Sequence, residues 1–458
     1  MTDGRIEIIG VSDCTEKVCA AAGRISTQSG TALEIFERSQ DNEKNTKLIS
    51  KVTASGHTST VEHIFFNLAF ENVSVVVEQF MIEFRLASFT VKSRRYVDFS
   101  DSGYYTPDFK NEEDKKEYTS HMDSLFALYS EFCENGIAKE DARFVLPYCF
   151  YSNFYCSLCG RELINVLRAM LYGRGRKTAE IYELGKKLLE DCKKIAPGVF
   201  GSLEAQYAGY TDTPDFNIEP EENGNGILPH QSVELLSLTP DCAKRVAEFA
   251  LIENLNLSSS QIEKLVNDSE KRKEIIRQTV SLTRSRPLEA VSCTVRFNDV
   301  SLSTLTHFTR HRMQSIGIPA LSSCKRDSYI IPESVKENEL LFDKYIEAFE
   351  KTAALFEKMK AKGYTESETV YCLLSGNTLD FVTTMNGREL LLFMKLRSCN
   401  RAQWEIRNYA VELLGKLREA DKELFSFFGP SCYTTGICPE GKLTCGKIKE
   451  VKEIFSAE

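Results

Sequence analysis

The chain has no long hydrophobic run and few of the residues that favour disorder. None of its apolar stretches approaches the roughly 20 residues that a membrane-spanning helix needs. Only 12 prolines and 25 glycines are spread over 458 residues, which argues against long disordered segments. The start, MTDGRIEIIGVSD, lacks a basic region followed by an apolar one. We therefore expect no secretory signal, no membrane association and a cytoplasmic protein.

Lysine and arginine are also outnumbered by aspartate and glutamate. The chain has 57 Lys and Arg against 66 Asp and Glu, a net charge of −9, so nucleic acid is not expected as a partner. Its 15 cysteines are odd in number and scattered, which indicates reduced thiols rather than a disulfide framework. With 42% hydrophobic and 27% charged residues, the composition is that of a globular protein large enough for two or three domains.

The sequence matches itself when it is shifted by 227 residues, and by 225 residues further along. The superimposed segments include Glu7-Ile8-Ile9 with Glu234-Leu235-Leu236, Phe70-Glu71-Asn72-Val73-Ser74 with Phe297-Asn298-Asp299-Val300-Ser301, Gly160-Arg161-Glu162-Leu163 with Gly387-Arg388-Glu389-Leu390, and Glu180-Ile181 with Glu405-Ile406. One shift that holds over roughly 150 residues indicates two tandem copies of one domain.

The copies predict four regions. We expect a first copy at 1–212, a polar linker at 213–232 rich in Pro, Gly, Asp and Glu, a second copy at 233–429 and a cysteine-containing tail at 430–458.

Each copy predicts the same order of elements. A helix with small residues at 18–22 precedes a helical stretch near 31–52. A strand follows, then a helix at about 73–87 (300–315 in the second copy) and two or three long helices. The strand residues that alternate with an opposite face are Ile64, Phe66, Leu68 and Phe70, and in the second copy Val291, Cys293, Val295 and Phe297. The expected fold class is α/β (α+β), a small mixed sheet packed with long helices in each copy.

Two basic clusters are candidate anion sites. Arg310-His311-Arg312 lies on a predicted helix, where neighbouring side chains point about 100° apart and could grip a polyanion from several sides. Lys92-Ser93-Arg94-Arg95-Tyr96 combines a hydroxyl with two guanidinium forks that match phosphate oxygens. A solvated helix turn and an ordinary basic loop are the respective alternatives.

Two further segments combine polar side chains. The run 55–63, SGHTSTVEH, leads into the predicted strand and either binds a ligand or caps local backbone. Asn386-Gly387-Arg388-Glu389 precedes Arg397 and Arg401, which are four residues apart and are predicted to share a helix face. Two like charges on one face favour an anion between them, although Arg401 could instead pair with Glu405.

Together these motifs resemble flavin-dependent thymidylate synthases. The resemblance rests on GHTSTVEH before a strand, on Arg310-His311-Arg312, on the run 142–147 (ARFVLP) and on 401–407 (RAQWEIR), in that family's order over nearly all of 1–430. The chain departs from the family pattern at His307, where the family usually has Gln, and at Arg401, where it has His.

The family pattern is divided unevenly between the copies. The first copy keeps Ser93 and Arg143, whose counterparts are Ala320 and Val370, and the second keeps the Arg-His-Arg run and Asn386. The arginine at position 397 has no evident counterpart near 170–172. What one copy lost, the other retained, which predicts hybrid sites built from both.

The resemblance implies roles for individual residues. The implied catalytic residues are Arg397, Arg312 and His57. The implied dUMP-binding residues are Ser93, Arg94, Arg95, Arg143, Arg310 and Arg397. The implied FAD-binding residues are Ser59, Glu62, Arg310, His311, Arg312, Asn386, Arg388 and Arg401.

The resemblance also implies a reaction and an assembly. dUMP is reductively methylated to dTMP, with methylenetetrahydrofolate as carbon source, NADPH as reductant and FAD as cofactor. Because family members are tetramers with shared sites, two tandem chains are expected to form a homodimer that acts as a pseudo-tetramer. The alternatives are a non-catalytic or altered-substrate descendant that binds flavin or nucleotide, and a flavin oxidoreductase without methyl transfer.

Two groups of cysteines remain. Cys156 and Cys159 are expected in a helical apolar stretch, packed in the core. Cys432, Cys438 and Cys445 lie in the Gly-rich tail and suit a metal clip, but a fourth ligand is missing from the pattern, and no metal site is assigned.

Overall fold

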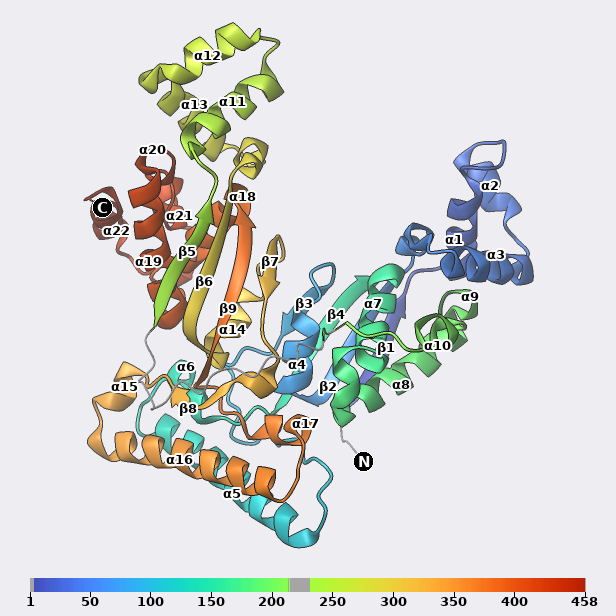
Figure 1. The fold of residues 1–458 in the computed structure, drawn as a ribbon, viewed down its shortest axis with the longest axis vertical. Coiled ribbons are helices and arrows are strands. Elements are labelled where there is room, and N and C mark those ends of the chain that lie inside the picture. The colour runs from blue at the N-terminus through green and yellow to red at the C-terminus, as the bar shows by residue number, and fades with distance from the viewer. Residues whose placement is uncertain (1–3, 213, 215–230, 458) are drawn as a thin grey trace. The chain divides into compact units, whose positions relative to one another are not determined.

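The computed structural model describes residues 4–212, 214 and 231–457 (Figure 1). Its chain divides into two units, one of 1–225 with 331–375 and the other of 226–330 with 376–458. The predicted linker at 213–232 falls almost entirely outside the described residues.

The first repeat contains one small sheet and a set of helices. Its strands and main helices are β1 (Arg5–Val11), α1 (Thr15–Arg24), α2 (Ala32–Arg38), α3 (Asn42–Ala54), the 3-10 helix η1 (Thr58–His63), β2 (Phe65–Ser74), α4 (Val75–Ile82), β3 (Ser88–Val91), α5 (Glu112–Glu134), α6 (Lys139–Ala142), β4 (Tyr151–Cys159), α7 (Gly160–Leu171), η3 (Arg174–Lys177), α8 (Ala179–Ile195), α9 (Pro197–Phe200) and α10 (Leu203–Tyr207).

The second repeat, taken with the tail at 430–458, has the same order of strands and α-helices apart from the added strand β8 and the added helices α15 and α22. Its elements are β5 (Ser232–Leu238), α11 (Cys242–Asn254), α12 (Ser259–Asn267), α13 (Ser269–Ser281), η4 (Arg286–Ala290), β6 (Ser292–Ser301), α14 (Leu302–Phe308), β7 (Gln314–Gly317), β8 (Lys325–Tyr329), α15 (Glu333–Lys336), α16 (Glu339–Ala361), α17 (Glu366–Thr369), β9 (Asn377–Asn386), α18 (Gly387–Arg397), α19 (Trp404–Ala420), α20 (Lys422–Phe425), α21 (Ser431–Thr434) and α22 (Ile448–Ala457).

The two sheets have matching topology, which confirms the α/β fold and its duplication. The first runs β1-β2-β4-β3 and the second β5-β6-β9-β7, with β8 added beside β9, and the strand pairs are antiparallel. The predicted alternation also holds, because Phe66, Leu68 and Phe70 are buried on β2.

Both central strands carry the same irregularity. The register of β2 against β4 shifts between Phe70 and Val73, and that of β6 against β9 between Phe297 and Val300. Asn72 and Asp299 occupy these bulges with φ of 49° and 52°. Asn and Asp tolerate the left-handed region better than other side chains, which explains these residue types at the two positions.

The helical stretch predicted near 31–52 is confirmed and consists of two helices, since Asp41 caps the second one. The structure corrects two other predictions of local structure. The helix expected at 73–87 ends at Ile82, and 88–91 forms β3, because the chain must turn back to pair with β4. Cys156 and Cys159 lie on strand β4 and not in a helix, although Cys156 is buried as expected.

A segment of the second repeat completes the unit that holds the first. Helix α16 packs along α5, and the pair is drawn side by side in Figure 1. Nζ of Lys358 lies 2.6 Å from Glu117, and a ring nitrogen of His121 lies 2.8 Å from the hydroxyl of Thr352. The compact units therefore do not coincide with the two sequence repeats.

A buried glutamate side chain makes the same pair of hydrogen bonds in each repeat. Glu180 accepts hydrogen bonds from the backbone N–H (2.8 Å) and the hydroxyl (2.6 Å) of Ser74, and Glu405 accepts the same two bonds from Ser301 at the same distances. These contacts tie the start of α4 to α8 in the first repeat and the start of α14 to α19 in the second. Glu180 also accepts a bond of 3.0 Å from the Tyr371 hydroxyl.

We expect Glu180→Gln to flatten the pH dependence of stability. Burial raises the pKa of Glu180 to about 7. The hydrogen bonds that Ser74 and Tyr371 donate to the carboxylate lower the pKa, but by less than burial raises it. Because the folded state holds this proton more tightly than the unfolded chain, its stabilising contribution is full below about pH 4.5 and is lost as the pH rises towards 7. Urea unfolding measured from pH 5 to 8 should show that the free energy of unfolding of the variant rises by up to about 3 kcal/mol relative to that of the parent. Equal slopes for the two proteins would contradict this.

Candidate functional site

The Arg-His-Arg run lies in a turn and not on a helix, which corrects the prediction. Helix α14 ends at Phe308, and the chain must reverse within a few residues to start β7 at Gln314. Arg310 and Arg312 are exposed, whereas His311 between them is buried. The turn thus presents two guanidinium groups outward and one imidazole inward.

His311 is the centre of a polar chain through unit 2. Its Nδ1 lies 2.8 Å from Oε1 of Glu389, and its Nε2 accepts a hydrogen bond of 2.9 Å from Nε of Arg397. Oδ1 of Asn386 in turn accepts the backbone N–H of Glu389 and caps α18. The sequence predicted His311, Arg397 and Asn386 as site residues, and the fold brings these three into one network.

This network fixes the protonation of His311. An arginine N–H can only donate, so Nε2 must be an acceptor and the ring proton lies on Nδ1, directed at Glu389. Burial lowers the pKa of His311, as does the charge of Arg397, whereas Glu389 opposes the change. The imidazole is therefore neutral near pH 7, and its orientation is set from both sides.

Two other predicted residues of the second copy stand apart from this network. Arg388 forms an exposed ion pair of 2.8 Å with Glu289. Arg401 does not share a helix face with Arg397, because α18 ends at Arg397 and a turn precedes α19. Glu405 is buried and accepts hydrogen bonds from Ser301.

Beside this network, α14 and α19 bury polar atoms that have no hydrogen-bond partner among the described residues. They are the Ser303 hydroxyl, Nε2 of Gln403 and Nε of Arg407. Such atoms are costly to bury unpaired. They are donors that a polar ligand or another chain could satisfy.

In unit 1, Arg94 is committed to a buried carboxylate. Its guanidinium pairs with Glu78, which also accepts from the Ser152 hydroxyl, and the ring of Phe150 lies 5.3 Å away. The side chains of Arg94 and Glu78 are 5% and 0% exposed. Arg94 is therefore placed to hold the loop at 92–97 rather than to face solvent.

Ser93, Arg95 and Arg143 lie around one short segment. Arg95 pairs with the carboxylate of Glu140, whose backbone carbonyl accepts a bond of 3.0 Å from Nε of the buried Arg143. The hydroxyl of Ser93 accepts the N–H of Arg95 at 3.3 Å. The structure thus brings together three of the residues predicted to bind nucleotide in the first copy.

The predicted residues before β2 lie elsewhere in unit 1. His57 and Ser59 are exposed at the start of η1. Glu62 forms an exposed ion pair of 2.6 Å with Arg161, the counterpart of Glu289–Arg388 in the second repeat. A pair that recurs in both copies is explained by the fold alone.

Arg397 has a counterpart in the first repeat, Arg174, that the aligned sequence did not reveal. Arg174 donates from Nη2 to the Phe80 carbonyl at 3.5 Å, as Arg397 does to the carbonyl of His307 at 3.1 Å, and 80 and 307 are 227 apart. Arg174 pairs with Glu83, the residue that replaces Arg310. Arg174 lies four residues beyond the position that the shift of 227 aligns with Arg397, so only the basic run 174–177 could have indicated it.

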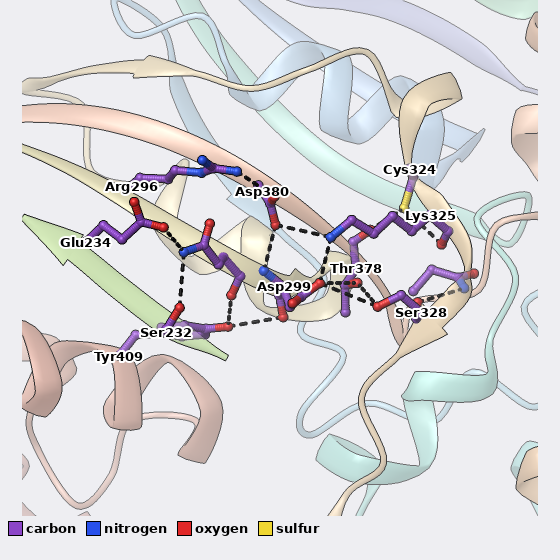
Figure 2. A network of polar contacts seen from close by, with 12 residues as sticks. Ser232, Glu234, Arg296, Asp299, Cys324, Lys325, Ser328, Thr378, Asp380 and Tyr409 are labelled. Carbon is purple, nitrogen blue, oxygen red and sulfur yellow. Dashed lines mark hydrogen bonds and ion pairs between the residues drawn. The ribbon is translucent and has the colours of Figure 1, made fainter. Parts of the chain in front are cut away.

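A charged network distinguishes the second sheet (Figure 2). Lys325 lies 2.9 Å from Asp299 and 3.6 Å from Asp380, which also pairs with Arg296 at 3.0 Å. Burial opposes ionisation of Asp380, but the Asp299 amide, Arg296 and Lys325 together hold its pKa below the ordinary value. Lys325 thereby fastens β8 to the sheet.

Comparisons with known proteins show the family to which this chain belongs. The family model described as thymidylate synthase complementing protein matches twice, at residues 7–198 and 234–421, and the chain belongs to that family. The twofold match confirms the tandem copies. No described helix is long and apolar enough to cross a membrane.

Individual relatives are flavin-dependent thymidylate synthases. That of Clostridium tetani is 32% identical over 243 residues, covering 49% of this chain and 96% of the relative. That of Geobacter sulfurreducens is 30% identical over 227 residues, covering 49% and 97%. A crystal structure of a UMP/dUMP methylase from Streptomyces cacaoi with 5-Br dUMP matches with 22% identity and a TM-score of 0.38, over 45% of this chain and 96% of that one.

Proposed function

We propose that the protein is an FAD-dependent thymidylate synthase that converts dUMP to dTMP with methylenetetrahydrofolate and NADPH. The observation that carries this is the His311 network, in which a neutral imidazole and Arg397 are held rigidly between two exposed arginines. The names of the similar proteins support a flavin and a pyrimidine nucleotide as ligands.

The second repeat supplies the flavin side in this proposal. Arg310 and Arg312 neutralise the cofactor's pyrophosphate, and the buried donors of Ser303, Gln403 and Arg407 fit a polar ligand beside them. When bound, the flavin supplies the hydride chemistry. Arg397 places fixed positive charge where negative charge develops on the pyrimidine, and Glu389 keeps His311 oriented.

The first repeat supplies the phosphate side through Ser93, Arg95 and Arg143. Each live site takes these residues from a first copy and the Arg-His-Arg run from a second copy. Two chains then assemble into a homodimer that acts as a pseudo-tetramer. The complementary losses in the two copies support this arrangement, since independent decay would not sort them in this way.

The carboxylate partners of Arg94 and Arg95 favour a second candidate. Arg94 is buried against Glu78 and Arg95 is paired with Glu140, so fewer guanidinium groups are left to bind a phosphate. A descendant that binds flavin but takes another substrate would be consistent with this.

One assay separates the candidates. The purified chain is given dUMP, methylenetetrahydrofolate, NADPH and FAD under low oxygen, and dTMP, NADPH oxidation and bound FAD are measured. Formation of dTMP supports the first proposal. Bound FAD without dTMP favours the altered-substrate candidate, and NADPH oxidation that does not need dUMP would indicate an oxidoreductase. Neither dTMP nor bound FAD would overturn both proposals.

A further inference from the structure

Four cysteines of unit 2 gather at the end of α18. Cys399 lies two residues beyond that helix, Cys432 lies in α21, and Cys438 and Cys445 lie in the loop before α22. The tail pattern offered three of these thiols, and the fold adds the fourth, Cys399, from a segment more than thirty residues earlier.

Several contacts define this grouping. Cys399, Cys432 and Cys438 line one small pocket. Nδ2 of Asn400, the residue after Cys399, lies 3.9 Å from Sγ of Cys445. The hydroxyl of Ser431 donates to the Lys395 carbonyl at 3.3 Å and fastens α21 to α18. Three of the thiols thus line one pocket. Burial raises the pKa of Cys432, and Cys445 is near enough to raise it as well, as are Cys399 and Cys438.

The surroundings suit thiolate ligands. The backbone N–H of Arg401 points at Sγ of Cys399 over 3.5 Å, and donors to sulfur tune and stabilise a metal-bound thiolate. Lys395 lines the same pocket and offers a compensating positive charge.

The loop that carries two of these cysteines has little else to hold it. Gly436, Gly441 and Gly446 all have positive φ, and Ile437 and Leu443 are exposed. A segment that buries so few apolar side chains gains the most from a metal clip.

The spacing of the sulfurs distinguishes two kinds of centre. Four thiolates about 2.3 Å from one zinc ion lie within about 4 Å of one another. In the part of the chain that the structure describes, no three Cys, His, Asp or Glu side chains converge in that way. An iron–sulfur cluster distributes its thiolates over several iron atoms and accepts them further apart.

We propose that Cys399, Cys432, Cys438 and Cys445 bind a four-iron iron–sulfur cluster that anchors the C-terminal tail to the end of α18. The proposal does not rest on the proposed activity, and Arg397 lies only two residues from Cys399. Its loss would free the end of the helix that carries Arg397.

The test uses the full chain, purified without oxygen and then supplied with ferrous iron and sulfide. Iron, acid-labile sulfide and zinc are quantified, and the dithionite-reduced protein is examined by electron paramagnetic resonance. We expect about four iron and four sulfide per chain. Cys432→Ser and Cys438→Ser should lower the iron content by about tenfold or more, and Cys133→Ser, outside the group, should not.

Three results would overturn the proposal. One zinc per chain lost in the same variants would assign a mononuclear tetrathiolate site. A chain that binds no metal after reconstitution has no cluster. The same conclusion follows if these cysteines keep a disulfide during anaerobic handling without reductant. Iron unchanged in both variants would place it elsewhere. Circular dichroism shows whether each variant folds. If a variant does not fold, the iron content and the spectra of the parent chain still test the proposal.

Discussion

Arg397→Ala is expected to lower kcat for dTMP formation by about 10²–10³-fold. The substitution removes the fixed charge proposed to act on the pyrimidine and the donor to Nε2 of His311. Without that donor and that charge, the pKa of His311 should rise. Steady-state kinetics give the first effect, and histidine NMR gives the second.

Arg174→Ala is the matched control, because Arg174 makes the corresponding bond to the Phe80 carbonyl in the first repeat. It pairs with Glu83 and not with a histidine, so kcat should change by less than about threefold. Equal losses in the two variants would show that Arg397 acts through packing alone.

Glu78→Ala is expected to destabilise the fold by about 3–5 kcal/mol. The change leaves the guanidinium of Arg94 buried without its carboxylate, and the Ser152 hydroxyl also loses its acceptor. Removing one partner of a buried ion pair costs far more than the pair itself contributes. Urea unfolding of the full chain measures the loss.

Glu62→Ala provides the comparison, since the Glu62–Arg161 pair is about half exposed and should cost at most about 1 kcal/mol. The double variant Glu78→Ala with Arg94→Leu should recover much of the loss, because no buried charge remains. A double variant as unstable as Glu78→Ala alone would refute this explanation.

The duplication was predictable because internal repetition leaves a direct signal. The shift of 227 residues relates Asn72 to Asp299 at the two bulges, and Ser74 to Ser301 at the two buried carboxylates. Strand β2 was likewise predictable, since one buried face imposes a period of two.

The elements that the sequence could not place depend on tertiary contacts. Helical propensity extended α14 through the Arg-His-Arg run, but the pairing of β7 with β9 requires a turn there. Arg174 was missed because it lies four residues beyond the position that the shift of 227 aligns with Arg397. Cys399 looked isolated because the other three cysteines follow more than thirty residues later in the sequence. Arg94 looked like a phosphate ligand because nothing near it in sequence reveals that it pairs with Glu78.

The most direct test of the account compares mirrored substitutions in the two copies. Ser93→Ala and Arg310→Ala remove residues proposed for the live sites, and Ala320→Gly and Glu83→Ala alter the positions that correspond to them. dTMP formation is measured for all four variants, with folding checked by circular dichroism. The account predicts that activity falls by about 10²-fold or more in the first two and by less than about threefold in their mirrors. Similar losses in both pairs, or full activity in Ser93→Ala, would contradict sites built from both copies.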